Sequence, residues 1–307
     1  MGAPANAILT AGLGDILLTE AAVGEILLLL ADRETMRNDP SVVFLGDAAG
    51  SGSTVGQVSI VGLDGSDEMA APGEGVDLTN TAFTDASANV TIARQGLRYE
   101  MSNLSRAVDA SGVIDPMRFA RSMVGSADMR LQSLIAGLTD SFATVAGTSG
   151  INMSVTDWYT AQGNLVLSDV PGPYLAMLHG RQYVDFQADL RSEGGANQFV
   201  AATAAQLALR GPGFKGAFNG VNIFVSSKVP TANAAADRAG GMWGRGAIGF
   251  REATIPAAPG IDAIFAGPIM VAFDYNGAGG LLSINGEYLV GVIEIEDLRG
   301  TSIITDA

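Results

Sequence analysis

The stretch DPMRFARSMVGSADMRLQSLIAGLTDSF, from Asp115 to Phe142, decides the fold of this chain. It predicts one long helix, because Asp115 can accept a hydrogen bond from a free N–H of the first turn and Pro116 needs no donor there. Apolar residues then recur at steps of three and four, which places them on one face: Ala120, Val124, Ala127, Leu131, Leu134, Leu138 and Phe142. At about 1.5 Å per residue this helix would be roughly 42 Å long, a scaffold for the segments around it.

The segments before this helix are predicted to form a long hairpin. QVSIVG at residues 57–62 and NVTIARQGLRYEM at residues 89–101 alternate between apolar and polar positions, as half-buried strands do. The stretch between them is rich in Gly, Asp, Thr and Ala and has no basic residue. Because an isolated hairpin is only marginally stable in water, we expect this one to lie on a neighbour.

Shorter elements complete an α+β fold class. Small, Gly-rich residues 1–18 are predicted to form an extended arm, followed by a helix at 19–37 and a strand at 42–45. Beyond the long helix we predict helices at 155–162, 181–191 and 196–210, strands at 174–179 and 221–229, a loop at 231–241, and C-terminal strands at 268–275, 287–297 and 301–305.

The composition excludes several kinds of site. The chain has 307 residues, of which 48% are hydrophobic, and a net charge of −15, the wrong sign for a protein that grips nucleic-acid phosphates. With no cysteine and a single histidine, it cannot form disulfides, thiolate metal sites or a multi-histidine metal site. The most apolar run, residues 26–31, is too short to cross a bilayer, and the first basic residue is Arg33. We therefore expect a soluble protein without an export signal that folds inside a cell.

Two glycine-rich stretches could suggest phosphate-binding loops, but neither meets the requirements of one. GRGAIG places Gly244, Gly246 and Gly249 at dinucleotide-loop spacing, yet Pro256 follows soon and no second βαβ unit comes after it. GDAAGSGST, residues 46–54, lacks the lysine that a P-loop uses to reach phosphates, so it is interpreted as a linker.

The titratable residues form no catalytic pattern. His179 ends an apolar strand, and no third group that could orient it is evident, so we interpret it as structural. Asp64, Asp67 and Glu68 could bind a cation, but their spacing is not that of a calcium loop, and a solvated acidic tip is the simpler interpretation. We predict no catalytic residue, no cofactor and no metal site.

The order of these elements resembles that of the tailed-bacteriophage major capsid proteins with the Hong Kong 97-type fold. Residues 57–101 are similar to the family's extended loop, and Asp115–Phe142 to its spine helix. YLAMLHGRQYVDFQADL (Tyr174–Leu190) and residues 220–250 resemble its axial domain, and GVIEIEDLRGTSIITDA (residues 291–307) resembles the closing strands of its peripheral domain. The resemblance covers nearly the whole chain and rests on the order of elements rather than on one motif.

The resemblance implies a domain plan and a role. It implies an N-terminal arm and helix at 1–40, an extended loop at 41–102, a peripheral domain at 103–156 and 267–307, and an axial domain at 157–266. The protein would be a non-enzymatic shell subunit of the virion. It would assemble in the host cytoplasm into the hexamers and pentamers of an icosahedral head, and enclose DNA without sequence-specific binding or a membrane. The acidic balance suits a container that must not adhere to packaged DNA.

The resemblance also implies partners, namely neighbouring capsid subunits, a portal, decoration proteins and a scaffold. In this family the scaffold is either a separate protein or a cleaved N-terminal extension. Because the chain begins at Met1 and few residues precede its first predicted helix, we expect a separate scaffolding protein and a mature subunit near 31.4 kDa.

The charge distribution suggests how subunits would hold together. Some members join subunits by an isopeptide bond from a loop lysine, but this chain has no lysine before Lys215, so its lock is predicted to be non-covalent. Acidic loop residues would instead meet helix arginines of a neighbour, and the candidate contact residues are Asp64, Asp67, Glu68, Glu74, Asp77, Arg118 and Arg121. Alternatively these charges only keep the loop soluble, since exposed ion pairs contribute roughly 0–1 kcal/mol.

Two other functions stay open at this point. An encapsulin-type cargo compartment would share the fold and would hold a cargo enzyme instead of DNA. A small-molecule enzyme would need convergent titratable groups in a pocket, and the sequence contains no such constellation.

Overall fold

The computed structural model describes residues 36–61, 74, 85–108, 116–192, 199–210, 213–256, 263–277 and 279–306. The predicted arm, most of the helix predicted at 19–37, the predicted cap Asp115 and most of the tip of the long hairpin lie outside these residues.

The long helix is α3, Pro116–Ala136. Its 21 residues span roughly 31 Å at about 1.5 Å per residue, which is shorter than predicted because the chain turns from Gly137 onwards. Val124 and Leu131 are buried, as predicted, and Ala127, Leu134 and Leu138 pack against the same core. Phe142 is also buried, although it follows the helix.

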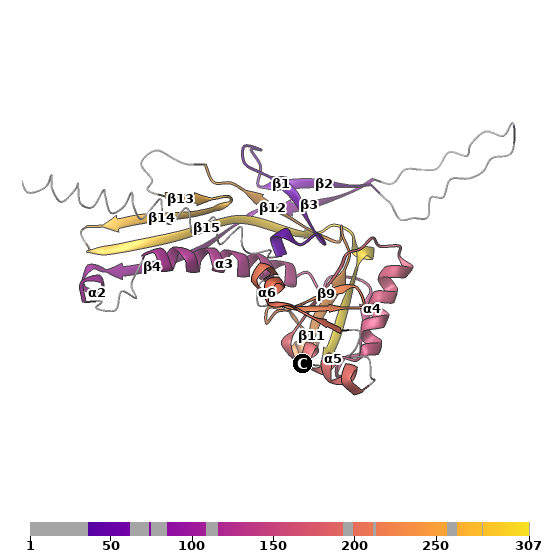
Figure 1. Ribbon diagram of the computed structural model, residues 1–307. Coiled ribbons are helices and arrows are strands. Elements are labelled where there is room, and N and C mark those ends of the chain that lie inside the picture. The colour runs from indigo at the N-terminus through magenta and orange to yellow at the C-terminus, as the bar shows by residue number, and fades with distance from the viewer. Residues whose placement is uncertain are drawn as a thin grey trace, which may run out of the picture.

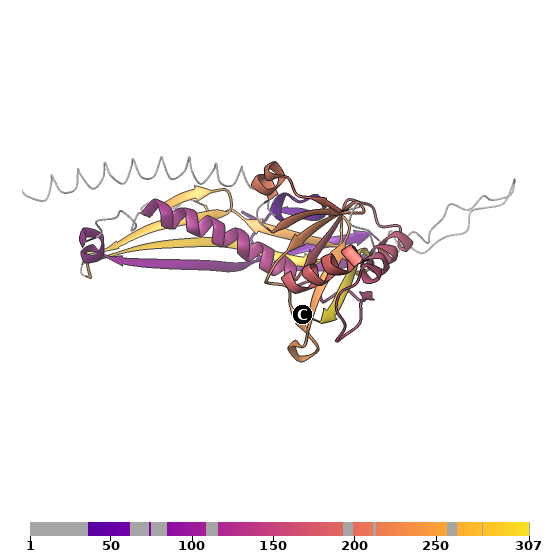
Figure 2. The ribbon, with the colours of Figure 1, turned by 60° about the horizontal axis from the view of Figure 1, so that its bottom comes forward.

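A six-stranded sheet carries α3 on one face. Its order is β1 (Val42–Asp47), β12 (Ile248–Ala253), β15 (Leu281–Glu294), β14 (Ile269–Asn276) and β13 (Ala263–Ala266), and β4 (Ala93–Ser102) also pairs with β15. Figures 1 and 2 show α3 lying along the length of β4 and β15. The contact is close because Gly286 has no side chain: a Cβ there would lie 2.9 Å from the Met123 Sδ.

An eight-stranded sheet forms the second part of the molecule. Its order is β5 (Val145–Ala146), β16 (Gly300–Asp306), β11 (Asp237–Trp243), β6 (Tyr174–Leu178), β9 (Val221–Val225), β8 (Phe214–Phe218) and β7 (Phe199–Ala201), and β10 (Thr231–Ala232) pairs with β11. Three helices accompany it, α4 (Val155–Leu167), α5 (Gly180–Ser192) and α6 (Ala204–Arg210). Trp158 stacks on Phe186 with ring centroids 4.9 Å apart, and Phe218 meets both rings edge-on.

The long hairpin begins on strands β2 (Val55–Val61) and β3 (Asp85–Thr91), which pair with each other. The strand predicted at 89–101 therefore divides near Ile92. Its first part belongs to β3, whereas its second part, β4, pairs with β15 and leads into α2 (Asn103–Val108).

Three segments differ from the sequence-based expectation. The helix predicted at 196–210 is wrong for its first part, because residues 199–201 pair with β8 and only the short α6 is helical. The loop predicted at 231–241 contains most of β11, a central strand. Residues 300–306, grouped by sequence with the peripheral strands, pair with β11 and β5 instead.

The chain crosses between the two sheets three times, at residues 137–144, 244–247 and 295–299. These crossings bond to one another. The Ala143 N–H donates to the Asp297 carboxylate at 2.7 Å, and the Ile295 N–H donates to the Ala247 carbonyl at 2.7 Å. Three mutually bonded crossings fix how the sheets meet.

Candidate assembly interface

The predicted contact residues are only partly placed by the structure. Asp64, Asp67, Glu68 and Asp77 lie outside the described residues, and Glu74 is an exposed turn residue. Arg118 and Arg121 belong to the first two turns of α3, and their side chains lie outside the described part of the structure. The predicted pairing of loop carboxylates with helix arginines therefore stays a prediction.

The base of the hairpin is fixed tightly to the six-stranded sheet. Val90 is buried, and the Ile92 N–H donates to the Thr54 carbonyl at 2.8 Å. Gly291 allows the close approach, because a Cβ there would lie 2.3 Å from the Thr91 carbonyl oxygen. β3 also contacts β15, so this part of the hairpin lies against the sheet (Figure 1). Nothing in the local sequence marked Gly291, since its role depends on a strand 200 residues earlier.

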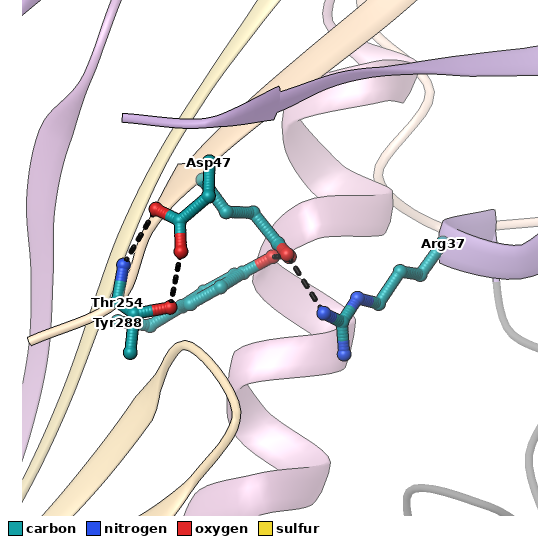
Figure 3. A network of polar contacts seen from close by, with 5 residues as sticks. Arg37, Asp47, Thr254 and Tyr288 are labelled. Atoms are coloured by element: carbon teal, nitrogen blue, oxygen red, sulfur yellow. Dashed lines mark hydrogen bonds and ion pairs between the residues drawn. The ribbon is translucent and has the colours of Figure 1, made fainter. Parts of the chain in front are cut away.

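A polar network ties the start of the described chain to the sheet (Figure 3). Glu252 on β12 is only 2% exposed, and its carboxylate accepts from Arg37 Nη2 at 2.8 Å and from the Tyr288 hydroxyl. Beside it, Asp47 at the end of β1 accepts from the Thr254 hydroxyl at 2.6 Å and from the Thr254 N–H at 3.0 Å. The network joins β1, β12 and β15 to η1 (Met36–Asn38), which contains Arg37.

The electrostatics of this network follow from burial. Burial raises the pKa of Glu252, while the hydrogen bond from Tyr288 and the charge of Arg37 oppose the rise. Burial, followed by the nearby Glu252 charge, raises the pKa of Tyr288 well above its ordinary value. The Thr254 hydroxyl lowers the pKa of Asp47. The two partners hold this buried carboxylate in place, and removing Arg37 would leave its charge without a compensating charge.

On β4, the face opposite α3 is polar. By the register of β4 with β15, Arg94, Arg98 and Glu100 point to that face. Arg98 pairs with Glu100 at 2.7 Å, and Arg94 pairs with Glu287. Both arginine side chains are more than half exposed, so each pair contributes roughly 0–1 kcal/mol. This face is suited to polar contacts rather than to a buried core.

A shallow pocket of about 360 Å³ lies beside this network, lined by Arg37, Asp39, Pro40, Val42, Val43, Phe44 and Arg245. Its one carboxylate, Asp39, already accepts from the Ser41 N–H at 2.9 Å and the Ser41 hydroxyl at 2.6 Å. Both bonds are to the same carboxylate oxygen, Oδ1, and they hold Asp39 at the turn before β1.

The motifs that resembled active-site elements have structural roles. Gly244 and Gly246 lie in the crossing from β11 to β12, so a strand and not a helix follows them, contrary to a dinucleotide loop. His179 precedes α5, where its Nδ1 accepts from the Arg181 N–H at 3.4 Å, and burial lowers its pKa. Within the described parts of the chain, no three acidic or histidine residues cluster as metal ligands would, and no helix is long and apolar enough to span a membrane.

No protein-family model matches the sequence, and no curated protein is detectably similar to it. Solved structures do match. The capsid of Ralstonia phage GP4 superposes with a TM-score of 0.61 at 11% identity, covering 90% of both chains. The chain has the Hong Kong 97-type capsid fold. The capsid of cyanophage P-SCSP1u matches this fold with a TM-score of 0.59 at 14% identity, over 89% of this chain and 88% of that one.

The same fold occurs in an encapsulin. The SrpI encapsulin of Synechococcus elongatus matches with a TM-score of 0.60 at 14% identity, over 86% of this chain and 85% of that one. The α+β class and the Hong Kong 97-type fold predicted from the order of elements are therefore confirmed.

Proposed function

We propose that this chain is the major shell protein of a tailed-bacteriophage head. The observation that carries the proposal is the match to the capsid of Ralstonia phage GP4 over 90% of both chains, an extent that leaves out neither of the two large sheets. In this role the protein is structural. It would reside in the virion and surround DNA without reading its sequence.

The proposed subunit has two domains. A peripheral domain would comprise α3 and the six-stranded sheet, and an axial domain would comprise the eight-stranded sheet with α4 and α5. Compared with the bounds 103–156 and 267–307 for the peripheral domain, this division moves β5 and β16 to the axial domain, because both pair there. It also adds β12 and β13 from the predicted axial domain 157–266, and β1 and β4 from the predicted extended loop 41–102, because all four belong to the six-stranded sheet.

The partners of such a subunit would be copies of itself in hexamers and pentamers, together with a separate scaffolding protein, a portal and decoration proteins. The net charge of −15 supports an enclosing role, since it repels packaged DNA. Between copies, the acidic loop residues Asp64, Asp67, Glu68, Glu74 and Asp77 would face Arg118 and Arg121, a contact supported by the charge pattern.

Negative-stain electron microscopy and light scattering of the purified protein test this proposal. We expect closed shells or rings of subunits, because a head subunit functions only in contact with copies of itself. A stable, compact monomer under all conditions would contradict it.

An encapsulin-type compartment is the second candidate, favoured by the match to the SrpI encapsulin. The contents of particles isolated from their native source separate the two functions. Nuclease-protected DNA inside the particles supports the phage head, whereas a packaged enzyme without DNA supports the compartment.

A further inference from the structure

One end of the eight-stranded sheet exposes an uncharged surface. We call Val200, Ala201, Thr203, Ala204, Ala205, Gln206 and Leu207 the edge surface; all seven are exposed. The side chain of Val200 is 64% exposed and that of Leu207 is 39% exposed. β7 is the last strand of its sheet, so among the described residues its outer edge has no partner strand. β7 is three residues long and contains no charged residue and no proline.

A second uncharged surface covers the outside of α4. We call Thr156, Tyr159, Thr160, Val166 and Leu167 the α4 face; all five are exposed. The opposite side of the helix is buried through Trp158, Ala161 and Leu165. Leu167 is 85% exposed and Val166 is 55% exposed. The one charged residue of α4, Asp157, is held at the helix start by the Ser154 hydroxyl at 2.7 Å.

The two surfaces lie on different sides of the subunit. α4 packs mainly along β16 and β5, at one end of the sheet order, whereas α6 neighbours β8 near the other end. Figure 1 shows α4 and α6 on opposite sides of β9. A rotation that brings the α4 face of one copy onto the edge surface of the next can be repeated around a ring, which an isologous contact cannot do.

We propose that the α4 face docks on the edge surface of a second copy of this chain. Charge argues for this occupant, because each copy carries a net charge of −15 and two copies approach with least repulsion across uncharged surfaces. Apolar contact then removes the exposed Val166, Leu167, Val200 and Leu207 side chains from water. The proposal rests on the proposed shell function and names the contact between adjacent subunits of one ring.

Charged substitutions at the centre of each surface test the contact. We expect Leu167→Glu and Leu207→Arg each to lower the association constant about tenfold or more, because each buries an unpaired charge between copies. Val184→Glu is the matched control, since Val184 on α5 is 62% exposed and outside both surfaces. Circular dichroism checks that each variant is folded. The double variant Leu167→Glu, Leu207→Arg should recover assembly, because the new charges would face each other.

A disulfide provides an independent readout, since the natural chain has no cysteine. The variant with Leu167→Cys and Leu207→Cys should form a ladder of linked subunits on a non-reducing gel after oxidation of the particles. The variant with Val184→Cys and Leu207→Cys should not.

The outcomes separate this inference from the proposed function. If the natural chain forms no rings or shells, the proposed function fails and the inference fails with it. If the natural chain assembles, and the single variants assemble as well as Val184→Glu or the cysteine pair gives no ladder, the inference alone is overturned.

Discussion

Gln182 is a single residue on which the packing of the eight-stranded sheet depends. Its side chain is fully buried. The amide nitrogen lies 3.0 Å from the Arg238 carbonyl, 3.1 Å from the Ile303 carbonyl and 2.9 Å from the Thr305 hydroxyl. The amide oxygen accepts from the His179 N–H at 3.0 Å. One side chain thus joins α5 to β11 and β16, and Gly240 leaves room for it, because a Cβ there would lie 2.8 Å from the amide oxygen.

Replacing Gln182 with leucine should destabilise the protein by about 2–4 kcal/mol, because buried carbonyl groups would lose their donor. Thermal unfolding of the purified protein measures the change. Gln187→Leu on the same helix is the control, since its amide bonds only to the half-buried Tyr183 hydroxyl at 2.9 Å. Equal unfolding temperatures for the two variants would count against this role of Gln182.

Glu252 and Asp47 should affect the pH dependence of stability in opposite directions. The pKa of Glu252 is raised in the folded protein, so its contribution to stability is fully present below its unfolded pKa and declines as the pH rises through the raised value. The pKa of Asp47 is lowered, so its contribution is present above its unfolded pKa and is lost as the pH falls through the lowered value.

Unfolding temperatures recorded between about pH 3 and pH 8 test these signs. Relative to the natural chain, Glu252→Gln should remove a decrease in stability that occurs as the pH rises. Asp47→Asn should remove an increase in stability that occurs as the pH rises. If both variants changed the slope of unfolding temperature against pH in the same direction, these two carboxyl groups would not have the opposite effects predicted here.

Among the elements, α3 supplies the apolar face that covers the six-stranded sheet. Its buried side chains include Met123, Leu131 and Ile135, which share a hydrophobic core with Ile284 of β15. The opposite side of the helix is exposed at Met129, whose side chain is 56% accessible. Loss of this helix would expose Ile284 and the other apolar residues of β4 and β15 that pack against it.

Leu131→Asp should destabilise the subunit by roughly 3–5 kcal/mol and abolish shells, because an unpaired charge would replace a side chain that is 1% exposed. Met129→Asp introduces the same charge two residues earlier on the exposed side and should change little. Particle yield after purification reports both effects. Normal yield from Leu131→Asp would refute the assignment of this face to the core.

At the scale of the whole molecule, charge limits how copies can meet. Of the 17 basic residues only two are lysines, and the first is Lys215, so the hairpin cannot supply an amine for an isopeptide bond. Any lock between hairpin and neighbour is therefore predicted to be non-covalent. Boiled particles should run as single subunits on a denaturing gel, and a covalent ladder would disprove this.

Charge reversal tests the proposed contact between the hairpin tip and α3. Arg118→Glu with Arg121→Glu should impair assembly, because both positions would then repel the acidic tip of a neighbour. The control is the double variant Arg181→Glu, Arg191→Glu, which changes the net charge by the same amount. Both of these arginines are exposed on α5. High salt should also weaken assembled shells, because exposed pairs are screened beyond roughly 10 Å at 0.1 M. Equal assembly of the two double variants would contradict the contact.

Local patterns determined the elements whose residues carry their own signal. The apolar face of α3, the buried strand β6, the amphipathic α5 and the alternating hairpin strands were all evident from spacing, because burial on one face imposes a period on the sequence. Their order along the chain was enough to predict the fold, since few architectures accommodate a long helix between a hairpin and closing strands.

Tertiary structure alone decided how the strands pair in the two large sheets. Ala-rich residues near 200 favour a helix locally, yet residues 199–201 form an edge strand because β8 offers them backbone partners. β16 follows β15 directly but pairs in the other sheet, a choice between two available edges that no local period encodes. Gln182, Glu252 and Gly291 likewise acquire their roles from residues far away in the sequence, because hydrogen bonds and close backbone approaches depend on positions in space.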